Sequence, residues 1–326
     1  MPDSAQPSSA KRKNKLLFFV KLAITAAICT IVVSSVDWQS IFLTIQNSNK
    51  VLLSSVFVLI VLSVTISAYK WKVILSIHGI DFSFNNLHKW YFVAMFLNNL
   101  LPSTIGGDGY RILKTIDNPK SKSSAVIAIF VERLTGLMAL LLLGYIGAIV
   151  SFLRGQDEFS RAIALSGTLI LLLLIPTLYL SYRFNILRSF INSDRCPTKI
   201  KSLLNNIEPY GAHPGKTAWV LLVSLFFQIH SIFFNWLLIV SLGKALDFFR
   251  LAVVVMMTNA IAVLPISING LGLTEGSFMY FTGLYGLDNE TALLSALILR
   301  VLIIPISLIG GLIYLRQDRT EAIADR

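Results

Sequence analysis

Two arginines lie within apolar stretches of the chain, where a charged side chain needs a specific partner. Arg133 lies in the segment FVERL and Arg300 in the segment LILRV. A charge inside a membrane span costs at least about 2.5 to 3.5 kcal/mol, and a guanidinium forks onto phosphate oxygens. We therefore predict that Arg133 and Arg300 bind a lipid phosphate, with structural ion pairing within the helix bundle as the alternative.

Two glycine-rich turns could supply backbone N–H donors to the same phosphate. A turn of this kind that opens a helix leaves N–H groups free, and the helix dipole adds positive charge there. Neither turn has the spacing of a nucleotide-binding P-loop, so nucleotide hydrolysis is not expected. The predicted additional phosphate contacts are Gly106, Gly107, Gly109, Arg111, Gly270 and Gly272.

Three carboxylates lie near these arginines in the sequence. Asp108, Glu132 and Glu275 are predicted to be counter-charges or to relay protons. Asp108 and Arg111 are three residues apart, a spacing that also allows a pair along one helix face. The sequence contains no motif of the common metal or hydrolytic sites, so we expect no metal and no cofactor.

The elements that must position these residues are membrane helices. Hydrophobic residues make up 55% of the 326, charged residues 14%, and the mean hydropathy is +0.72, which excludes an ordinary soluble domain. A span needs about 20 mostly apolar residues. Full-length spans are predicted at about 16–36, 51–69, 123–152, 162–182, 217–242 and 290–315.

Two further apolar stretches, 87–101 and 248–264, each end at a Leu-Pro followed by a glycine-rich turn. They predict broken or re-entrant helices. The turn sequences LPSTIGGDG and LPISINGLG resemble each other, and each precedes a helix with a central arginine. The residues predicted to support the interrupted helices are Asn98, Asn99, Pro102, Asn259, Pro265 and Asn269.

This repeat predicts an all-α polytopic membrane helical bundle with inverted repeats and two broken or re-entrant helix pairs. One domain is expected over 16–315, with repeat halves at about 51–153 and 217–315. Inverted halves of this kind build a midplane site from discontinuous helices in many transporters.

The distribution of basic residues predicts the orientation. Cytoplasmic loops carry an excess of Lys and Arg, and in this topology the basic tail 1–15, the basic loop 183–216 and the tail 316–326 are cytoplasmic. The expected location is the cytoplasmic (inner) membrane, with both termini on its cytoplasmic side. A net charge of +11 without a soluble basic module does not predict nucleic-acid binding. Only five of the 28 basic residues fall in outside loops: Lys50, Arg154, Arg161, Lys244 and Arg250.

Four segments together resemble the flippase-like transmembrane domain of lysylphosphatidylglycerol synthases. They are NNLLP at 98–102, GGDGYR at 106–111, ERLTG at 132–136 and NGLGLTE at 269–275. The resemblance covers about 16–315. It implies a membrane part that flips a lipid, whereas a separate soluble domain of the full synthases performs the aminoacyl transfer. The chain ends about ten residues after its last span, so we expect translocation without synthesis.

The expected function is therefore the translocation of a phospholipid or a lipid-linked phosphate-containing molecule across the membrane. Two alternatives stay open. One is an intramembrane enzyme acting on a phospholipid or polyprenyl-phosphate through Asp108, Glu132 or Glu275. The other is a membrane subunit that recruits a soluble lipid-modifying enzyme through the 183–216 loop. The expected partners are the lipid substrate and the membrane, and a homo-oligomer is left open.

Overall fold

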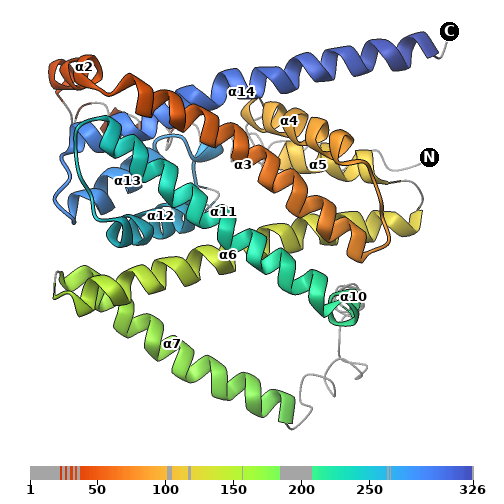
Figure 1. The fold of residues 1–326 in the computed structure, drawn as a ribbon, viewed down its shortest axis with the longest axis horizontal. Coiled ribbons are helices and arrows are strands. Elements are labelled where there is room, and N and C mark those ends of the chain that lie inside the picture. The colour runs from red at the N-terminus through yellow and green to blue at the C-terminus, as the bar shows by residue number, and fades with distance from the viewer. Residues whose placement is uncertain are drawn as a thin grey trace, which may run out of the picture.

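In the computed structural model of the chain, helices are the regular secondary structure of the residues it describes (Figure 1). These residues are 37–100, 105–116, 119–155, 157–183, 208–262, 264 and 266–324, with a few positions between 23 and 34. Over that part the chain forms eleven α-helices, one 3-10 helix and no strand. The predicted all-α bundle is confirmed. The basic tail 1–15, most of the first expected span, most of the 183–216 loop, Pro102 and Pro265 lie outside the described residues.

Four helices are long and apolar enough to span a membrane. Each contains an apolar segment of 28 or 31 residues, more than the roughly 20 that cross a hydrocarbon core. Four of the predicted spans match these helices, which identifies a polytopic membrane protein. The helices are α3 (Lys50–Ile77), α6 (Pro119–Leu153), α11 (Pro214–Ser241) and α14 (Asn289–Ala324).

Three other helices surround this set. The predicted span at 162–182 falls within α7, which packs against α6 and diverges from the other helices in Figure 1. Two short helices lie in the connections before α3 and α11. The bounds are α2 (Trp38–Asn47), α7 (Glu158–Arg183) and α10 (Glu208–Ala212).

Each interrupted stretch folds as two short helices. α4 (Phe84–Leu100) is followed by α5 (Ile105–Thr115), and α12 (Phe248–Ala262) by the 3-10 turn η1 (Ile268–Gly270) and α13 (Leu273–Gly283). The two members of each pair pack against one another. With 17 and 15 residues, α4 and α12 are shorter than the four long helices.

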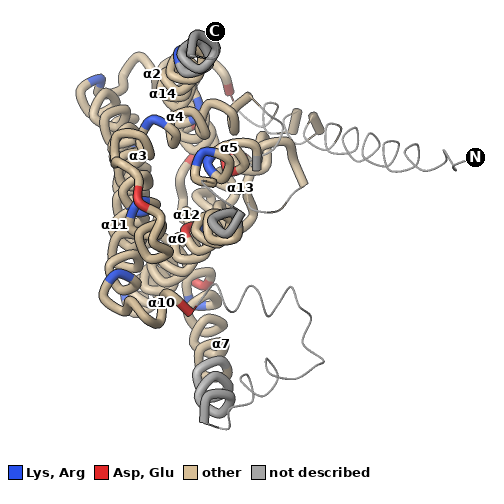
Figure 2. The backbone as a smooth tube through the Cα atoms, turned by 90° about the vertical axis from the view of Figure 1, so that its right-hand side faces the viewer, with Lys and Arg blue, Asp and Glu red and all other residues tan. Residues whose placement is uncertain are grey.

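The helices fall into two sets in chain order, α3 to α6 and α11 to α14, and one helix of each set packs mainly against the other set. α4 packs mainly against α14, and α12 packs mainly against α6. α3 and α11 run side by side in opposite directions (Figure 1). Seen end on in Figure 2, α3 and α11 form one side of the bundle, while α5 and α13 lie on the other.

Glycines allow close contact where α4 packs against α14 and where α12 packs against α6. A Cβ at Gly310 of α14 would lie 2.0 Å from the Phe92 backbone oxygen of α4, and a Cβ at Gly147 of α6 would lie 2.5 Å from the Phe249 oxygen of α12. Real Cβ atoms do not approach that closely, so only glycine fits. The backbones of the two sets therefore touch, as small residues allow in membrane bundles.

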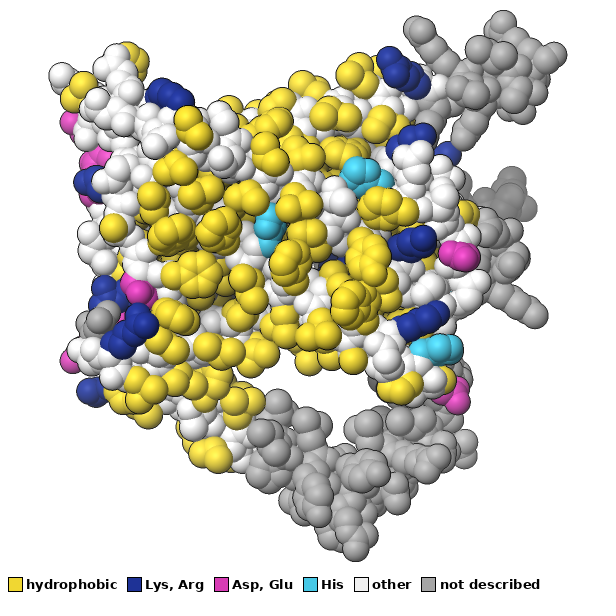
Figure 3. Space-filling view, viewed as in Figure 1, with side chains coloured by type: hydrophobic (Ala, Val, Ile, Leu, Met, Phe, Trp, Pro, Cys, Tyr) yellow, Lys and Arg dark blue, Asp and Glu magenta, His cyan; other side chains and the backbone are white. Residues whose placement is uncertain are grey.

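Ion pairs join the loops at one end of the bundle. Arg154 pairs with Asp247 at 3.2 Å and Lys244 with Asp288 at 2.9 Å. Burial alone would raise the pKa of Asp288, but hydrogen bonds from Lys244 and Thr291 outweigh it and hold that pKa below its usual value. Figure 3 shows charged side chains at the left and right edges of the molecule, with a broad apolar band between them. That band is the surface expected to face lipid.

Candidate functional site

A cavity of about 950 Å³ lies at the centre of the bundle, between the two sets of helices. Residues from α3 and α4 line it together with residues from α11, α12, α13 and α14. Most of the lining is apolar, and a volume of this size suits a lipid headgroup or a drug-sized ligand. The polar lining residues are Ser63, Ser67, Tyr91, Asn99, Ser231, Asn235, Thr258, Asn259, Asn269, Thr274, Glu275 and Arg300.

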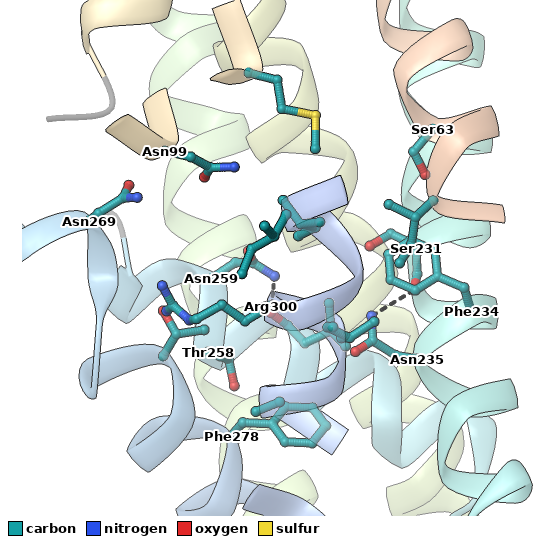
Figure 4. Close-up of a pocket in the computed structure, with 18 of the residues that line it drawn as sticks. Ser63, Asn99, Ser231, Phe234, Asn235, Thr258, Asn259, Asn269, Phe278 and Arg300 are labelled. Carbon is teal, nitrogen blue, oxygen red and sulfur yellow. Dashed lines mark hydrogen bonds between the residues drawn. The ribbon is translucent and has the colours of Figure 1, made fainter. Parts of the chain in front are cut away.

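Arg300 and Glu275 form the charged pair of the lining. The Nε of Arg300 donates to Oε1 of Glu275 at 2.5 Å, and the Arg300 side chain keeps 32% of its surface exposed. Over the described residues, no hydrogen bond is recorded for the two Nη groups of Arg300. In Figure 4 this guanidinium lies among Asn99, Asn259 and Asn269. Arg300 therefore presents an uncommitted donor edge next to the cavity.

The start of α13 fixes Glu275 in place. Asn269, Gly270 and Gly272 have φ values of 52°, 71° and 76°, a left-handed conformation that glycine, and to a lesser degree asparagine, adopts at low cost. The turn ends with the Gly272 N–H, which donates to Oε2 of Glu275 at 2.8 Å. The donor predicted to bind phosphate at Gly272 is thus taken by Glu275.

The asparagines around the two turns have different partners. Asn98 accepts from the Gly107 N–H at 2.8 Å through its side chain, and its backbone oxygen accepts from Nδ2 of Asn269 at 3.3 Å. This second bond joins the end of α4 to η1. Asn259 instead donates to the Val255 oxygen of its own helix at 2.8 Å. The two interrupted elements therefore meet beside the cavity.

A second charged cluster lies among α3, α4, α5 and α6, and its central residues, Arg111 and Glu132, are buried from solvent. Arg111 forms a direct ion pair with Glu132, and both are buried. The Arg111 guanidinium lies 4.1 Å from the ring centre of Trp71 and 4.4 Å from that of Tyr91, contacts that favour a cation. The Tyr91 hydroxyl donates to Oε1 of Glu132 at 3.1 Å, and Lys70 donates to the Glu132 backbone oxygen at 2.8 Å.

Arg133 joins this second cluster from its outer side. Its Nη2 and Nε donate to Oδ2 of Asp108 at 2.5 and 2.8 Å. Asp108 also lies 3.7 Å from Arg111. The Arg133 side chain is 57% exposed and does not line the central cavity. Arg300 therefore lies on the cavity, whereas Arg133 and Arg111, also predicted to bind phosphate, lie outside it.

The two arginine–carboxylate pairs correspond to one another in the chain. Asp108 and Arg133 are 25 residues apart, and so are Glu275 and Arg300. Gly144 and Gly311, which both lie at the exchanged helix contacts, follow the arginines by equal numbers of residues. This correspondence was readable from the sequence as a carboxylate 25 residues before each central arginine.

The predicted glycine donors lie at three kinds of position. Gly107 packs α5 against α4, because a Cβ there would lie 2.2 Å from the Ala94 oxygen. Gly106 and Gly109 lie within α5, and Gly270 ends η1. None of these four lines the cavity.

Sequence reasoning missed the cavity wall that α3 and α11 provide. Ser63 and Ser67 are four residues apart, as are Ser231 and Asn235, so each pair lies on one helix face. Figure 4 shows Ser63, Ser231 and Asn235 across the cavity from the Asn99 and Asn269 side. Polar pairs at this spacing in apolar helices were the available signal. The described residues hold no cluster of three or more potential metal ligands.

Comparison with known proteins agrees with this architecture. Residues 18–310 match the family model for the lysylphosphatidylglycerol synthase TM region. The chain is 28% identical to the UPF0104 membrane protein MJ1078 of Methanocaldococcus jannaschii over 69% of its own length and 95% of that protein. It is 25% identical to the UPF0104 membrane protein MJ1595 of the same organism, over 81% of its length and 82% of that protein.

Proposed function

Because this chain belongs to the lysylphosphatidylglycerol synthase TM-region family, we propose that it translocates a phospholipid or a lipid-linked phosphate compound across the cytoplasmic membrane. The observation that carries the proposal is Arg300, the cationic side chain among the described cavity-lining residues. A lipid phosphate would bind its free Nη edge while the acyl chains stay in the hydrocarbon. The Nε would remain on Glu275, so the guanidinium is held in position before the lipid arrives.

The proposed route depends on an inverted arrangement of the two helix sets. α3, α4, α5 and α6 would form one half, and α11, α12, α13 and α14 the other, with the interrupted pairs entering from opposite leaflets. The antiparallel α3 and α11 and the exchanged contacts of α4 and α12 support this arrangement. In transporters built this way, the substrate site lies between the halves near the midplane, and the cavity described above is lined by helices of both proposed halves.

The proposed orientation places both termini in the cytoplasm. The predicted outside residues Arg154, Lys244 and Arg250 lie at one end of the bundle, where each has a carboxylate within 4 Å. Neutralised basic residues at that end fit the outer side of the membrane, and the opposite end, with Lys72 and Lys216, fits the inner side.

We propose transport in preference to catalysis because each candidate acid or base is engaged by an arginine. Glu132 is held by Arg111, Asp108 by Arg133 and Glu275 by Arg300. A carboxylate already bound to a guanidinium is poorly placed to exchange a proton with a substrate. Recruitment of a soluble enzyme would depend on the 183–216 loop, most of which lies outside the described residues.

The test is translocation in phosphatidylcholine vesicles that contain acyl-labelled fluorescent phosphatidylglycerol, with dithionite to bleach the outer leaflet. The variant is the double substitution Arg300→Gln and Glu275→Gln, which leaves no buried unpaired charge. Losing the charged hydrogen bonds should slow translocation about 10- to 100-fold. The matched control is Arg154→Gln with Asp247→Asn, an exposed ion pair far from the cavity. Unchanged translocation by a folded double variant would overturn the proposal.

A further inference from the structure

The exposed part of the cavity wall lies beside the interrupted helices. Among the described lining residues, those of α3 and α11 are half-buried or buried. Figure 4 shows Asn99 and Asn259 on the side of the cavity away from Ser63 and Ser231. The cavity therefore opens on that side, and we call the opening the mouth. Its five exposed residues are Asn99 and Leu100 at the end of α4, Asn259 near the end of α12, Leu271 between η1 and α13, and Ile304 in α14.

The mouth lies at the depth of the hydrocarbon core. Ile304 is 15 residues from Asn289 and 12 residues from Arg316, the two ends of the apolar segment of α14. At about 1.5 Å per residue, roughly 18 to 22 Å of helix extends from Ile304 in each direction. Half of the hydrocarbon core is only about 15 Å thick. The mouth therefore faces acyl chains and is remote from the water on both sides of the membrane.

The side chains of the mouth suit both parts of a lipid. Leu100, Leu271 and Ile304 are 67%, 40% and 51% exposed, so they offer apolar contacts to acyl chains. Asn99 and Asn259 are exposed beside them, and polar residues at hydrocarbon depth are costly and mark substrate pathways. Arg300 lies one helical turn before Ile304, on the same face of α14. A polar path thus leads from an apolar rim to the guanidinium.

The size of the cavity shows which part of a lipid it can enclose. A volume of about 950 Å³ suits a headgroup or a drug-sized ligand, and two long acyl chains need further space. Those chains cannot move into water without a large cost in free energy. They must therefore lie in hydrocarbon that is continuous with the cavity, and the mouth provides that continuity.

We propose that the mouth is a lateral entrance, through which a lipid headgroup passes from the bilayer into the cavity while its acyl chains rest on Leu100, Leu271 and Ile304. This inference rests on the proposed function and adds an acyl-chain site and a direction of access to it. The headgroup reaches Arg300 by moving past Asn99 and Asn259. The substrate arrives from the hydrocarbon and does not cross the aqueous ends of the bundle.

Photo-crosslinking tests the acyl-chain site directly. The full chain is placed in phosphatidylcholine vesicles with phosphatidylglycerol that carries a diazirine in the middle of one acyl chain, and labelled residues are located by mass spectrometry. Leu100 and Ile304 should be labelled more than Leu62, a 43% exposed residue near the middle of α3 that does not line the cavity. The excess should disappear in the double variant Arg300→Gln with Glu275→Gln, because the headgroup is no longer held.

Tryptophan substitution tests the entrance by narrowing it. Leu100→Trp and Ile304→Trp should each slow translocation of acyl-labelled fluorescent phosphatidylglycerol about 5- to 100-fold, because overfilling a packed space has a free-energy cost of that size. Leu62→Trp places the same side chain near the middle of a span outside the mouth and should leave the rate unchanged. Ile304→Ala, which widens the mouth, should not slow translocation.

The outcomes separate this inference from the function it rests on. Labelling of Leu100 and Ile304 no stronger than that of Leu62 would overturn the acyl-chain site, because the mouth would then be ordinary lipid-facing surface. Natural rates in folded Leu100→Trp and Ile304→Trp proteins would overturn the entrance and leave translocation standing. Crosslinking does not require movement, so excess labelling of a folded protein that moves no lipid would overturn the proposed function and support the acyl-chain site.

Discussion

The two arginine–carboxylate pairs of this protein share their spacing in the chain but not their surroundings. Asp108–Arg133 lies at the exposed edge of a cluster whose buried Arg111 is enclosed by Trp71 and Tyr91. Glu275–Arg300 faces an open cavity with no comparable enclosure of its guanidinium. The difference teaches that a duplicated charged motif can be structural in one half of a bundle and available for a ligand in the other.

The first cluster contains an additional ion pair, Arg111 with Glu132, that the second half lacks. Arg111 has no charged counterpart in the second half, where the short helix α13 carries Glu275 as its charged residue. In the first half, Glu132 neutralises Arg111 inside the bundle, so Asp108 is left to Arg133 at the periphery. The additional Arg111–Glu132 pair thus distinguishes the first cluster from the Glu275–Arg300 pair at the cavity.

The largest expected effect tests whether the cluster around Arg111 is structural. Glu132→Ala leaves Arg111 buried without its main counter-charge, which should lower the free energy of unfolding by about 3–5 kcal/mol. The double variant Arg111→Met with Glu132→Leu removes both charges and should recover most of that loss. Denaturation in mixed detergent micelles measures both. A Glu132→Ala protein as stable as the natural chain would show that the cluster does not hold the bundle together.

A smaller effect is expected from the glycine that presses α5 onto α4 and so closes this cluster. Gly107→Ala places a methyl group 2.2 Å from the Ala94 oxygen and should destabilise the protein by about 1–3 kcal/mol. Gly109→Ala in the same helix meets nothing within 4 Å and should stabilise it by about 0.5–1 kcal/mol. The same denaturation assay compares them. Changes of the same sign would mean that α5 is not packed as tightly as the structure shows.

The sequence was sufficient to predict the long and the interrupted helices, although not the short helices α2 and α10. Uninterrupted apolar runs gave the four long helices, and the Leu-Pro and glycine-rich turns marked the two interrupted ones. These features are local, because helix length and chain breaks depend on neighbouring residues. The first half of each interrupted stretch ends within two residues of its predicted end, as α4 ends at Leu100 and α12 at Ala262.

The environment of each charge could not be predicted in the same way. Arg111 was predicted to contact phosphate, yet Trp71 and Tyr91 of two other helices cover it. Whether an arginine faces a ring, a carboxylate or a cavity depends on the rotation of its helix against distant neighbours. The serines and Asn235 of the cavity wall were not predicted for the same reason. The role of a polar residue in a span depends on which neighbour its helix face contacts.

The smallest expected effect concerns the peripheral pair, and it bears most directly on the comparison. The Arg133 side chain is 57% exposed, so its bond to Asp108 should contribute less than about 1 kcal/mol. A double-mutant cycle with Asp108→Asn and Arg133→Gln measures that coupling. Arg133→Gln should also leave lipid translocation close to the natural rate, unlike substitution of Arg300 with its partner. If Arg133→Gln slowed translocation as strongly, both pairs would contact the substrate, and the division between a structural half and a binding half would be lost.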